Sequence, residues 1–121
     1  MTIEYDYIIE DDILKVTTQG QDDNLEEVMN YFDELIEIAK THNCFKVLCD
    51  ERNLAYTIPV FDTFQLAEYA SRQIKGYHKI AIICNNKYIK DRKFYETVSS
   101  NRGISILVSI DYNASLEWLL T

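Results

Sequence analysis

The stretch KVLCDERNLAYTIPVFDTF, residues 46–64, decides the fold that the sequence predicts. It begins with a short apolar strand, FKVLC at 45–49, which runs into the charged residues 50–52. A polar loop is expected next, and Pro59 suits the first turn of a helix because its missing N–H costs nothing there. The stretch therefore predicts a strand, a loop and a helix. In α/β proteins, ligands gather where such strands end.

Two strand-like segments and one helix precede this stretch. The segments 4–10 and 13–20 are separated by a gap too short for anything but a hairpin. Residues 22–42 carry apolar side chains at three- and four-residue spacing, which is typical of an amphipathic helix. Asp23 with Glu26 is the expected capping box of that helix.

Helices and strands alternate after the opening stretch. The expected elements are a helix at 60–75, a strand at 79–84, a helix at 91–103 ended by Gly103, a strand at 104–110, and a helix at 113–121 capped by Asn113. This order predicts an α/β fold with a mixed sheet of about five strands and four helices. The hairpin is antiparallel, the later strands are parallel, and residues 1–121 form one domain.

The composition limits the class of protein. No apolar run approaches the ~20 residues needed to span a membrane, and the acidic start does not resemble a signal peptide. The cysteines at 44, 49 and 84 have no CxxC spacing, so neither a disulfide framework nor a zinc site is expected. We therefore expect a cytoplasmic protein without a metal or cofactor.

The charge is unevenly distributed along the chain. Residues 1–40 hold 12 acidic and 2 basic side chains, whereas residues 72–102 hold 8 basic and 2 acidic ones. The net charge of −8 argues against a general nucleic-acid binder. The asymmetry permits a protein partner, or a second copy in a homodimer, to dock by charge.

An aspartate at a strand end also raises the question of a response-regulator receiver. That family needs an acidic pair after its first strand, a phosphoacceptor aspartate and a lysine ending its last strand. Here the acidic pair Asp11-Asp12 lies in the hairpin, and the last strand ends at Ser109-Ile110 without a lysine. The chain also lacks a Ser/His/Asp pattern and a phosphate-binding glycine loop, so we expect no catalysis.

Four segments carry a resemblance to a known family. They are KVLCDERNL at 46–54, FDTFQLAEYA at 61–70, KIAIIC at 79–84 and FYETVSSNRGISILVSIDYNASLEWLL at 94–120. Together they resemble the STAS fold of anti-sigma factor antagonists, and more closely its SpoIIAA-like bacterial branch. The resemblance implies a regulatory module that binds proteins without catalysis. Because these are fold-level patterns, the function they imply is an analogy.

The regulatory serine of that family has no counterpart here. Phosphoregulated antagonists carry it in a DSSG-like turn at the start of the helix that follows this strand. The corresponding run AYTIPVFD, residues 55–62, has no serine and no glycine, and its nearest hydroxyl is Thr57. The sequence therefore predicts a module without the usual phosphorylatable serine, with Thr57 as an ordinary turn hydroxyl.

The predicted surface for a partner or ligand comprises seven residues: Asp50, Arg52, Tyr56, Thr57, Phe61, Tyr69 and Arg102. Asp50 either lines a groove or bonds loop amides, as aspartates in turns commonly do. Arg52 either offers its planar guanidinium to an anionic group or pairs with a surface acid. Arg102 lies at a helix C-terminus, where a structural role is a sufficient explanation.

A second hypothesis is a carrier of a small anionic or lipid-like ligand. SpoIIAA-like proteins share a broad architecture with Sec14-type lipid-binding domains, and the basic stretch 72–102 suits an anionic head group. A carrier needs an apolar cavity of roughly several hundred Å³. Such a cavity beneath the helix 60–75, lined by Phe61, Phe64 or Tyr69, would favour the carrier, whereas a packed core would favour the docking module.

Overall fold

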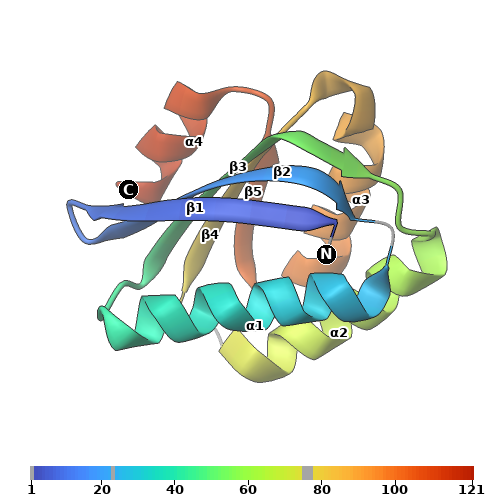
Figure 1. Ribbon diagram of the computed structural model, residues 1–121, viewed down its shortest axis with the longest axis horizontal. Coiled ribbons are helices and arrows are strands. Elements are labelled where there is room, and N and C mark those ends of the chain that lie inside the picture. The colour runs from blue at the N-terminus through green and yellow to red at the C-terminus, as the bar shows by residue number, and fades with distance from the viewer. Residues whose placement is uncertain (1, 23, 75–77) are drawn as a thin grey trace.

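The computed structural model describes residues 2–22, 24–74 and 78–121 (Figure 1). Its elements are β1 (Ile3–Glu10), β2 (Ile13–Asp22), α1 (Leu25–Thr41), β3 (Lys46–Tyr56), α2 (Val60–Ile74), β4 (Lys79–Cys84), the 3-10 turn η1 (Asn86–Tyr88), α3 (Ile89–Ser100), β5 (Ser105–Ser109) and α4 (Tyr112–Leu119). The predicted order of elements is confirmed. None of the helices in these ranges is both long and apolar enough to cross a membrane.

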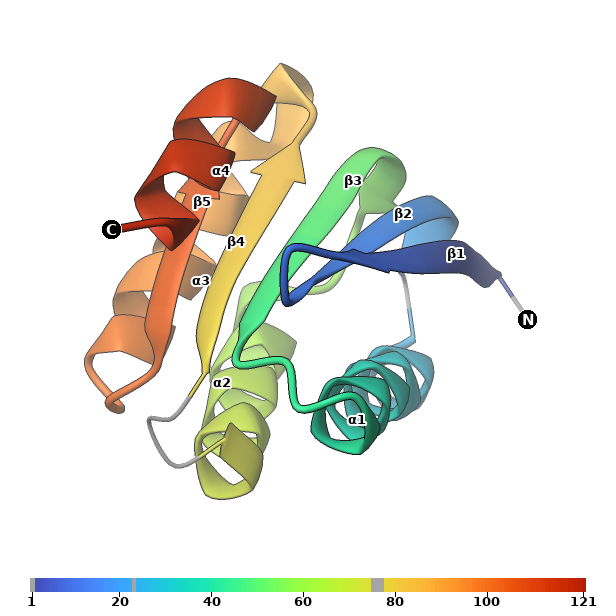
Figure 2. The ribbon, with the colours of Figure 1, turned by 90° about the vertical axis from the view of Figure 1, so that its left-hand side faces the viewer.

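The five strands form one mixed sheet in the order β1-β2-β3-β4-β5. β1 and β2 are antiparallel, and the other neighbours are parallel, as predicted. The main core packs α1, α2 and α3 against one face of the sheet. α4 lies on the opposite face of the sheet (Figure 2). Its Leu119 belongs to a second, smaller core cluster with Leu48 and Ile83. One face of β3 is therefore covered by α1, α2 and α3, and the other face by α4.

β3 is longer than the sequence predicted. The expected strand ended at residue 49, but β3 continues to Tyr56 and pairs with β2 along nearly its whole length, as far as Asp22. The charged residues 50–52 thus lie in the strand and not in a loop. Hydrogen bonding to a long neighbouring strand has overridden the weak strand propensity of these polar residues.

A β-bulge interrupts this pairing where the predicted loop was to begin. Asp50 pairs with Thr17 and Asn53 with Gln19, so two residues of β3, at 51 and 52, oppose one of β2. An extra residue reverses the alternation of side chains along the bulged strand. Consequently Glu51 in the bulge and Tyr56 after it both line the cavity on the α1–α3 face.

Two predicted helix caps are wrong. α1 is capped by Asn24, whose side chain accepts from the backbone N–H of Glu27 at 3.0 Å; the predicted cap Asp23 lies outside the described residues. α4 is capped by Asp111 instead of Asn113, since the helix begins earlier than expected and the Asp111 carboxylate accepts from Ala114. Both residues found share the short polar side chains that favour this position.

Gly20→Ala is expected to lower the free energy of unfolding by about 2–3 kcal/mol. Gly20 has φ +110°, and an added Cβ would lie 1.9 Å from the carbonyl oxygen of Thr2, which directly precedes the neighbouring strand β1. Gly103→Ala is the matched control. α3 ends at Ser100, earlier than predicted, and Gly103 lies in the turn that follows it, with φ +86°. Nothing lies within 4 Å of an added Cβ there, so only the backbone cost of about 1 kcal/mol remains. If urea denaturation showed that both variants lose the same free energy of unfolding, the predicted clash at Gly20 would be contradicted.

Candidate functional site

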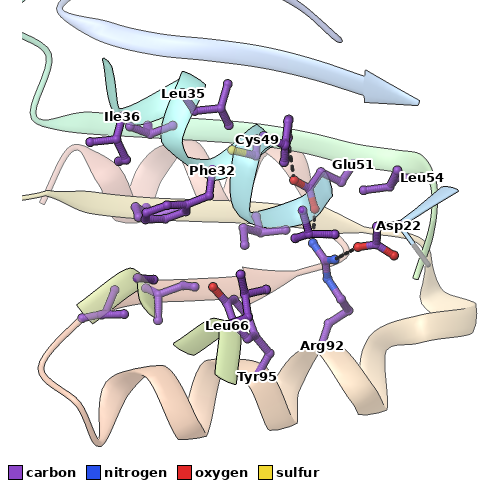
Figure 3. Close-up of a pocket in the computed structure, with 18 of the residues that line it drawn as sticks. Asp22, Phe32, Leu35, Ile36, Cys49, Glu51, Leu54, Leu66, Arg92 and Tyr95 are labelled. Atoms are coloured by element: carbon purple, nitrogen blue, oxygen red, sulfur yellow. Dashed lines mark hydrogen bonds and ion pairs between the residues drawn. The ribbon is translucent and has the colours of Figure 1, made fainter. Parts of the chain in front are cut away.

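An ionic cluster of Asp22, Glu51 and Arg92 is buried where β2 and β3 pass beneath α2 and α3 (Figure 3). The three residues are 2%, 5% and 4% exposed. Arg92 rises from α3, its Nη2 donates to Glu51 Oε1, and its Nη1 lies 3.6 Å from Asp22 Oδ2. Charges this deeply buried are tolerated only when they are paired, since desolvation costs several kcal/mol per ion.

A chain of hydroxyl groups completes the Glu51 side of the cluster. Tyr31 of α1 donates its phenol to Glu51 Oε2 at 2.8 Å. The same phenol oxygen lies 2.7 Å from Thr18 Oγ1, on the residue of β2 opposite the bulge. Because it is bonded to Tyr31 and to Arg92, the Glu51 carboxylate joins β3 to both α1 and α3.

The Asp22 side joins the cluster to the start of α2. The backbone N–H of Thr57 donates to Asp22 Oδ1 at 3.2 Å. The Arg92 guanidinium lies 4.6 Å from the centre of the Tyr56 ring, a cation–π distance. The Tyr56 hydroxyl is 2.9 Å from Thr63 Oγ1 in the first turn of α2. The cluster thus fixes the ends of two strands against two helices.

The cluster holds two acids and one base in a buried environment. Burial raises the pKa of Asp22 to about 7, Arg92 opposes that rise, and Glu51 adds to it. Burial lowers the pKa of Arg92, but the charges of Glu51 and Asp22 outweigh it and the net direction is upward. Arg92 therefore stays charged, and Asp22 holds a proton in mildly acidic solution.

The neighbouring thiol and phenol are not activated for nucleophilic chemistry. Burial raises the pKa of Cys49 well above its ordinary value, with Glu51 adding to the rise. Burial and Glu51 also raise the pKa of Tyr31. A nucleophile needs its anionic form, which this environment disfavours. Among the described residues, no group of three His, Cys, Asp or Glu side chains is placed to hold a metal ion.

A cavity of about 60 Å³ adjoins the cluster, between the sheet and helices α1, α2 and α3 (Figure 3). Apart from the cluster its wall is mostly apolar, with Phe32 and Leu66 among the side chains that close it. It is far smaller than the ~300–1,000 Å³ of small-molecule pockets and has room for a few waters. Phe61, Phe64 and Tyr69 do not line it, so it has neither the size nor the position that the carrier hypothesis required.

The outer sides of α2 and α3 carry an exposed aromatic patch, defined as Val60, Phe61, Phe64 and Phe94. These side chains are 58%, 70%, 42% and 37% exposed. The rings of Phe64 and Phe94 meet edge to face with centroids 5.4 Å apart, which joins the two helices into one surface. Adjacent large apolar side chains in solvent are typical of an interaction surface.

Asp50 and Arg52 lie away from both the cluster and the patch. Arg52 Nε and Nη2 donate to the two carboxylate oxygens of Asp50 at 2.8 and 2.6 Å. The Arg52 guanidinium is also 5.8 Å from the ring centre of Tyr112 in α4. These residues therefore pair with one another on the α4 face. Arg52 thus pairs with a surface acid, Asp50, which is one of the two arrangements that the sequence left open.

The other predicted residues fall in three places. Tyr56 and Thr57 contact the cluster, and Phe61 is the most exposed member of the patch. Tyr69 donates its phenol to Asp33 and so links α2 to α1. Arg102 bonds Glu68 Oε2 at 3.0 Å and its guanidinium lies 5.9 Å from the ring centre of Phe64, at the edge of the patch.

The sequence analysis missed the three residues of the cluster. Each of them looks like a surface charge in its own segment. The signal that could have found Arg92 is its spacing from Tyr95 and Ser99, which places it on the buried face of α3. Glu51 carried a weaker signal, since it continues an apolar strand.

Comparison with known proteins identifies the fold. No family model and no curated protein matches the sequence. Among solved structures, the chain is similar to an anti-sigma factor antagonist from Mycobacterium paratuberculosis, with a TM-score of 0.68 and 6% identity over 98% of this chain and 95% of that one. The chain thus has the fold of an anti-sigma factor antagonist, which confirms the resemblance at the level of fold.

Proposed function

We propose that this protein is a non-catalytic, regulatory docking module of the bacterial cytoplasm, which binds a protein partner through the aromatic patch. The exposure of Phe61 and Phe64 beside Phe94 is the observation that carries this proposal. Aromatic side chains, phenylalanine included, are enriched at the centres of protein interfaces. The shared fold with a protein described as an anti-sigma factor antagonist supports it by analogy.

The charges around the patch define the partner further. Lys90 lies one helical turn before Phe94 on α3, and Lys87 and Lys93 are exposed nearby in the sequence. Lys93 is paired with Glu96 within the same helix. The partner surface is therefore expected to have an apolar centre and an acidic rim.

The ionic cluster supports this role by holding the patch in place. Arg92 and Phe94 are neighbours on α3, while Thr63 and Phe64 are neighbours on α2. Arg92 is bonded to Glu51 and Thr63 to Tyr56, and both partners lie in β3. These bonds fix α3 and α2, the two helices that carry the phenylalanine rings of the patch. A surface fixed before binding loses less conformational entropy on binding.

We propose that Thr57 is not a phosphorylation switch. Its backbone N–H is bonded to the Asp22 carboxylate, and its hydroxyl donates to the Asp22 carbonyl oxygen at 3.4 Å. A phosphate there would stand beside a carboxylate and would be repelled when Asp22 is ionised. This agrees with the absence of the family's serine.

The double variant Phe61→Ala/Phe64→Ala is expected to weaken partner binding by roughly thirtyfold or more, since each interface aromatic commonly contributes more than ~1 kcal/mol. The partner would be captured from the source organism, purified, and titrated calorimetrically. Phe45→Ala is the matched control, because Phe45 is 60% exposed but lies outside the patch. A partner that binds the double variant and the wild type equally would contradict the proposal.

Native mass spectrometry of the purified protein separates the docking module from the ligand carrier. We expect the mass of the bare chain, as a monomer or as a homodimer, because the cavity of about 60 Å³ is too small for a lipid-like ligand. A small molecule that is retained in the native spectrum and released on denaturation would contradict the docking module and establish the carrier.

A further inference from the structure

Strand β1 leaves one side of its backbone open. It lies at the edge of the sheet, and within the described residues it pairs with β2 alone, from Ile3 opposite Gly20 to Glu10 opposite Ile13. The pairing runs without a bulge over all eight residues. An edge strand of this kind presents a row of unpaired N–H and C=O groups on its outer side.

The side chains of β1 do little to block another strand sterically. Proteins commonly protect an edge with charged side chains, proline or a bulge. β1 has no proline and no bulge, and its charged side chains are all acidic, so they do not repel a basic strand. Tyr7, Ile8 and Ile9 are 43%, 58% and 37% exposed. Tyr7 and Ile9 pair with β2 residues that face the main core, whereas Ile8 pairs with Lys15 on the other face. An added strand would therefore meet apolar side chains on both faces.

The surroundings of this edge are strongly acidic. β1 contributes Glu4, Asp6 and Glu10 and contains no basic residue, although Glu10 is paired with Lys15 of β2 at 2.6 Å. A groove of about 580 Å³ runs between β1 and α1, and four carboxylates from α1 line it: Glu26, Glu27, Asp33 and Glu34. Thr2 and Tyr5 donate to two of these carboxylates but do not neutralise their charge. The edge therefore favours a positively charged strand.

A second copy of the chain does not fit this edge. Because Glu4, Asp6 and Glu10 lie on one face of β1, two β1 strands paired with these faces on the same side would bring acidic side chains together, which is destabilising. The opposite edge strand of the sheet, β5, has the sequence SILVS and offers no positive charge. The basic residues of α3 lie on a helix and cannot add to a sheet.

We propose that the β1 edge binds an extended segment of a partner protein in which lysine or arginine alternates with apolar residues. The segment adds to the five-stranded sheet as a further strand. Backbone hydrogen bonds to β1 supply affinity, and Glu4, Asp6 and Glu10, which share the face of β1 turned away from α1, select for basic side chains on that face. This surface contains no residue of the aromatic patch, so the inference goes beyond the proposed function.

The test uses the full chain and a synthetic peptide of eight residues that alternates lysine and valine. Two control peptides replace every lysine by glutamate, or one central valine by proline. Amide hydrogen exchange and chemical shifts are followed by NMR. The lysine peptide is expected to slow the exchange of every second amide of β1, and both control peptides are expected to bind at least about fivefold more weakly.

A charge reversal locates the effect. Asp6→Lys in β1 and Glu117→Lys in α4 change the net charge equally at exposed positions. Asp6→Lys is expected to lower the affinity for the lysine peptide by about fivefold, and Glu117→Lys is expected to lower it much less. The proposal would be overturned if the two variants lowered the affinity for the lysine peptide equally, or if the proline peptide bound as tightly as the lysine peptide. It would also be overturned if the chemical-shift changes were confined to elements other than β1. Amides of β1 that are already protected by self-association in the free protein would overturn it as well.

Discussion

Arg92→Met is expected to lower the free energy of unfolding by about 3–5 kcal/mol. Methionine fills much of the same volume, but it leaves Glu51 and Asp22 as buried carboxylates without their common cation. Removing one partner of a buried ion pair costs far more than the pair contributes, because the remaining charge keeps its desolvation penalty. Urea denaturation followed by circular dichroism measures the change directly.

Two further variants test that explanation. Lys93→Met changes the neighbouring exposed position, and we expect a shift within about 0.5 kcal/mol. Arg92→Met combined with Glu51→Gln and Asp22→Asn removes all three charges, and we expect it to regain part of the lost stability. If Arg92→Met were as harmless as Lys93→Met, the cluster would not be a desolvated set of charges.

The protonation of Asp22 is expected to contribute to the wild-type free energy of unfolding, and this contribution falls by up to about 4 kcal/mol as the pH rises from 4 to 7. Asp22 has a pKa of about 7 in the folded chain and 3.8 as its ordinary value. Between these values the folded state binds a proton that the unfolded state has lost. Unfolding then releases a proton, so this contribution decreases with rising pH until the folded group is ionised.

Asp22→Asn isolates this contribution from the rest of the titration. Burial lowers the pKa of His78, and that group contributes in the opposite direction, so the wild-type profile alone is a sum. The variant keeps an acceptor for the Thr57 N–H but cannot ionise. We expect it to be nearly as stable as the wild type at pH 5 and about 2–4 kcal/mol more stable at pH 8.

The measurement is urea denaturation at both pH values. Asp6→Asn, at an exposed position of β1, serves as the control and should follow the wild-type profile. A difference between Asp22→Asn and the wild type that stays constant from pH 5 to pH 8 would contradict a raised pKa for Asp22.

The fold could be predicted because its signals are local and repeated. The apolar spacing of residues 25–39 and the continuous apolar runs at 47–49 and 80–84 report burial directly. Predicting the end of β3 was not possible in this way. The residues from Asp50 onwards are polar on one face, and the bulge breaks the period of two, so the pattern resembles a loop.

The candidate site was predicted only in part, for a different physical reason. Thr57 and Phe61 lie exposed near the strand-to-helix junction, as expected, because that junction follows from the fold. Tyr56 was expected on the same surface, but it is buried at the end of β3. Asp22 and Arg92 are 70 positions apart in the sequence. Their pairing depends on how β2 and α3 pack, and no short segment contains that information.

The bulge of β3 also affects how related chains can diverge. Before it, odd-numbered residues such as Cys49 line the cavity, and after it even-numbered residues such as Leu54 and Tyr56 do so. Losing one codon at this point would remove the bulge and restore a regular ladder with β2, and Leu54 and Tyr56 would still line the cavity. Related chains can therefore gain or lose this one residue without changing which side chains line the strand end beneath α2.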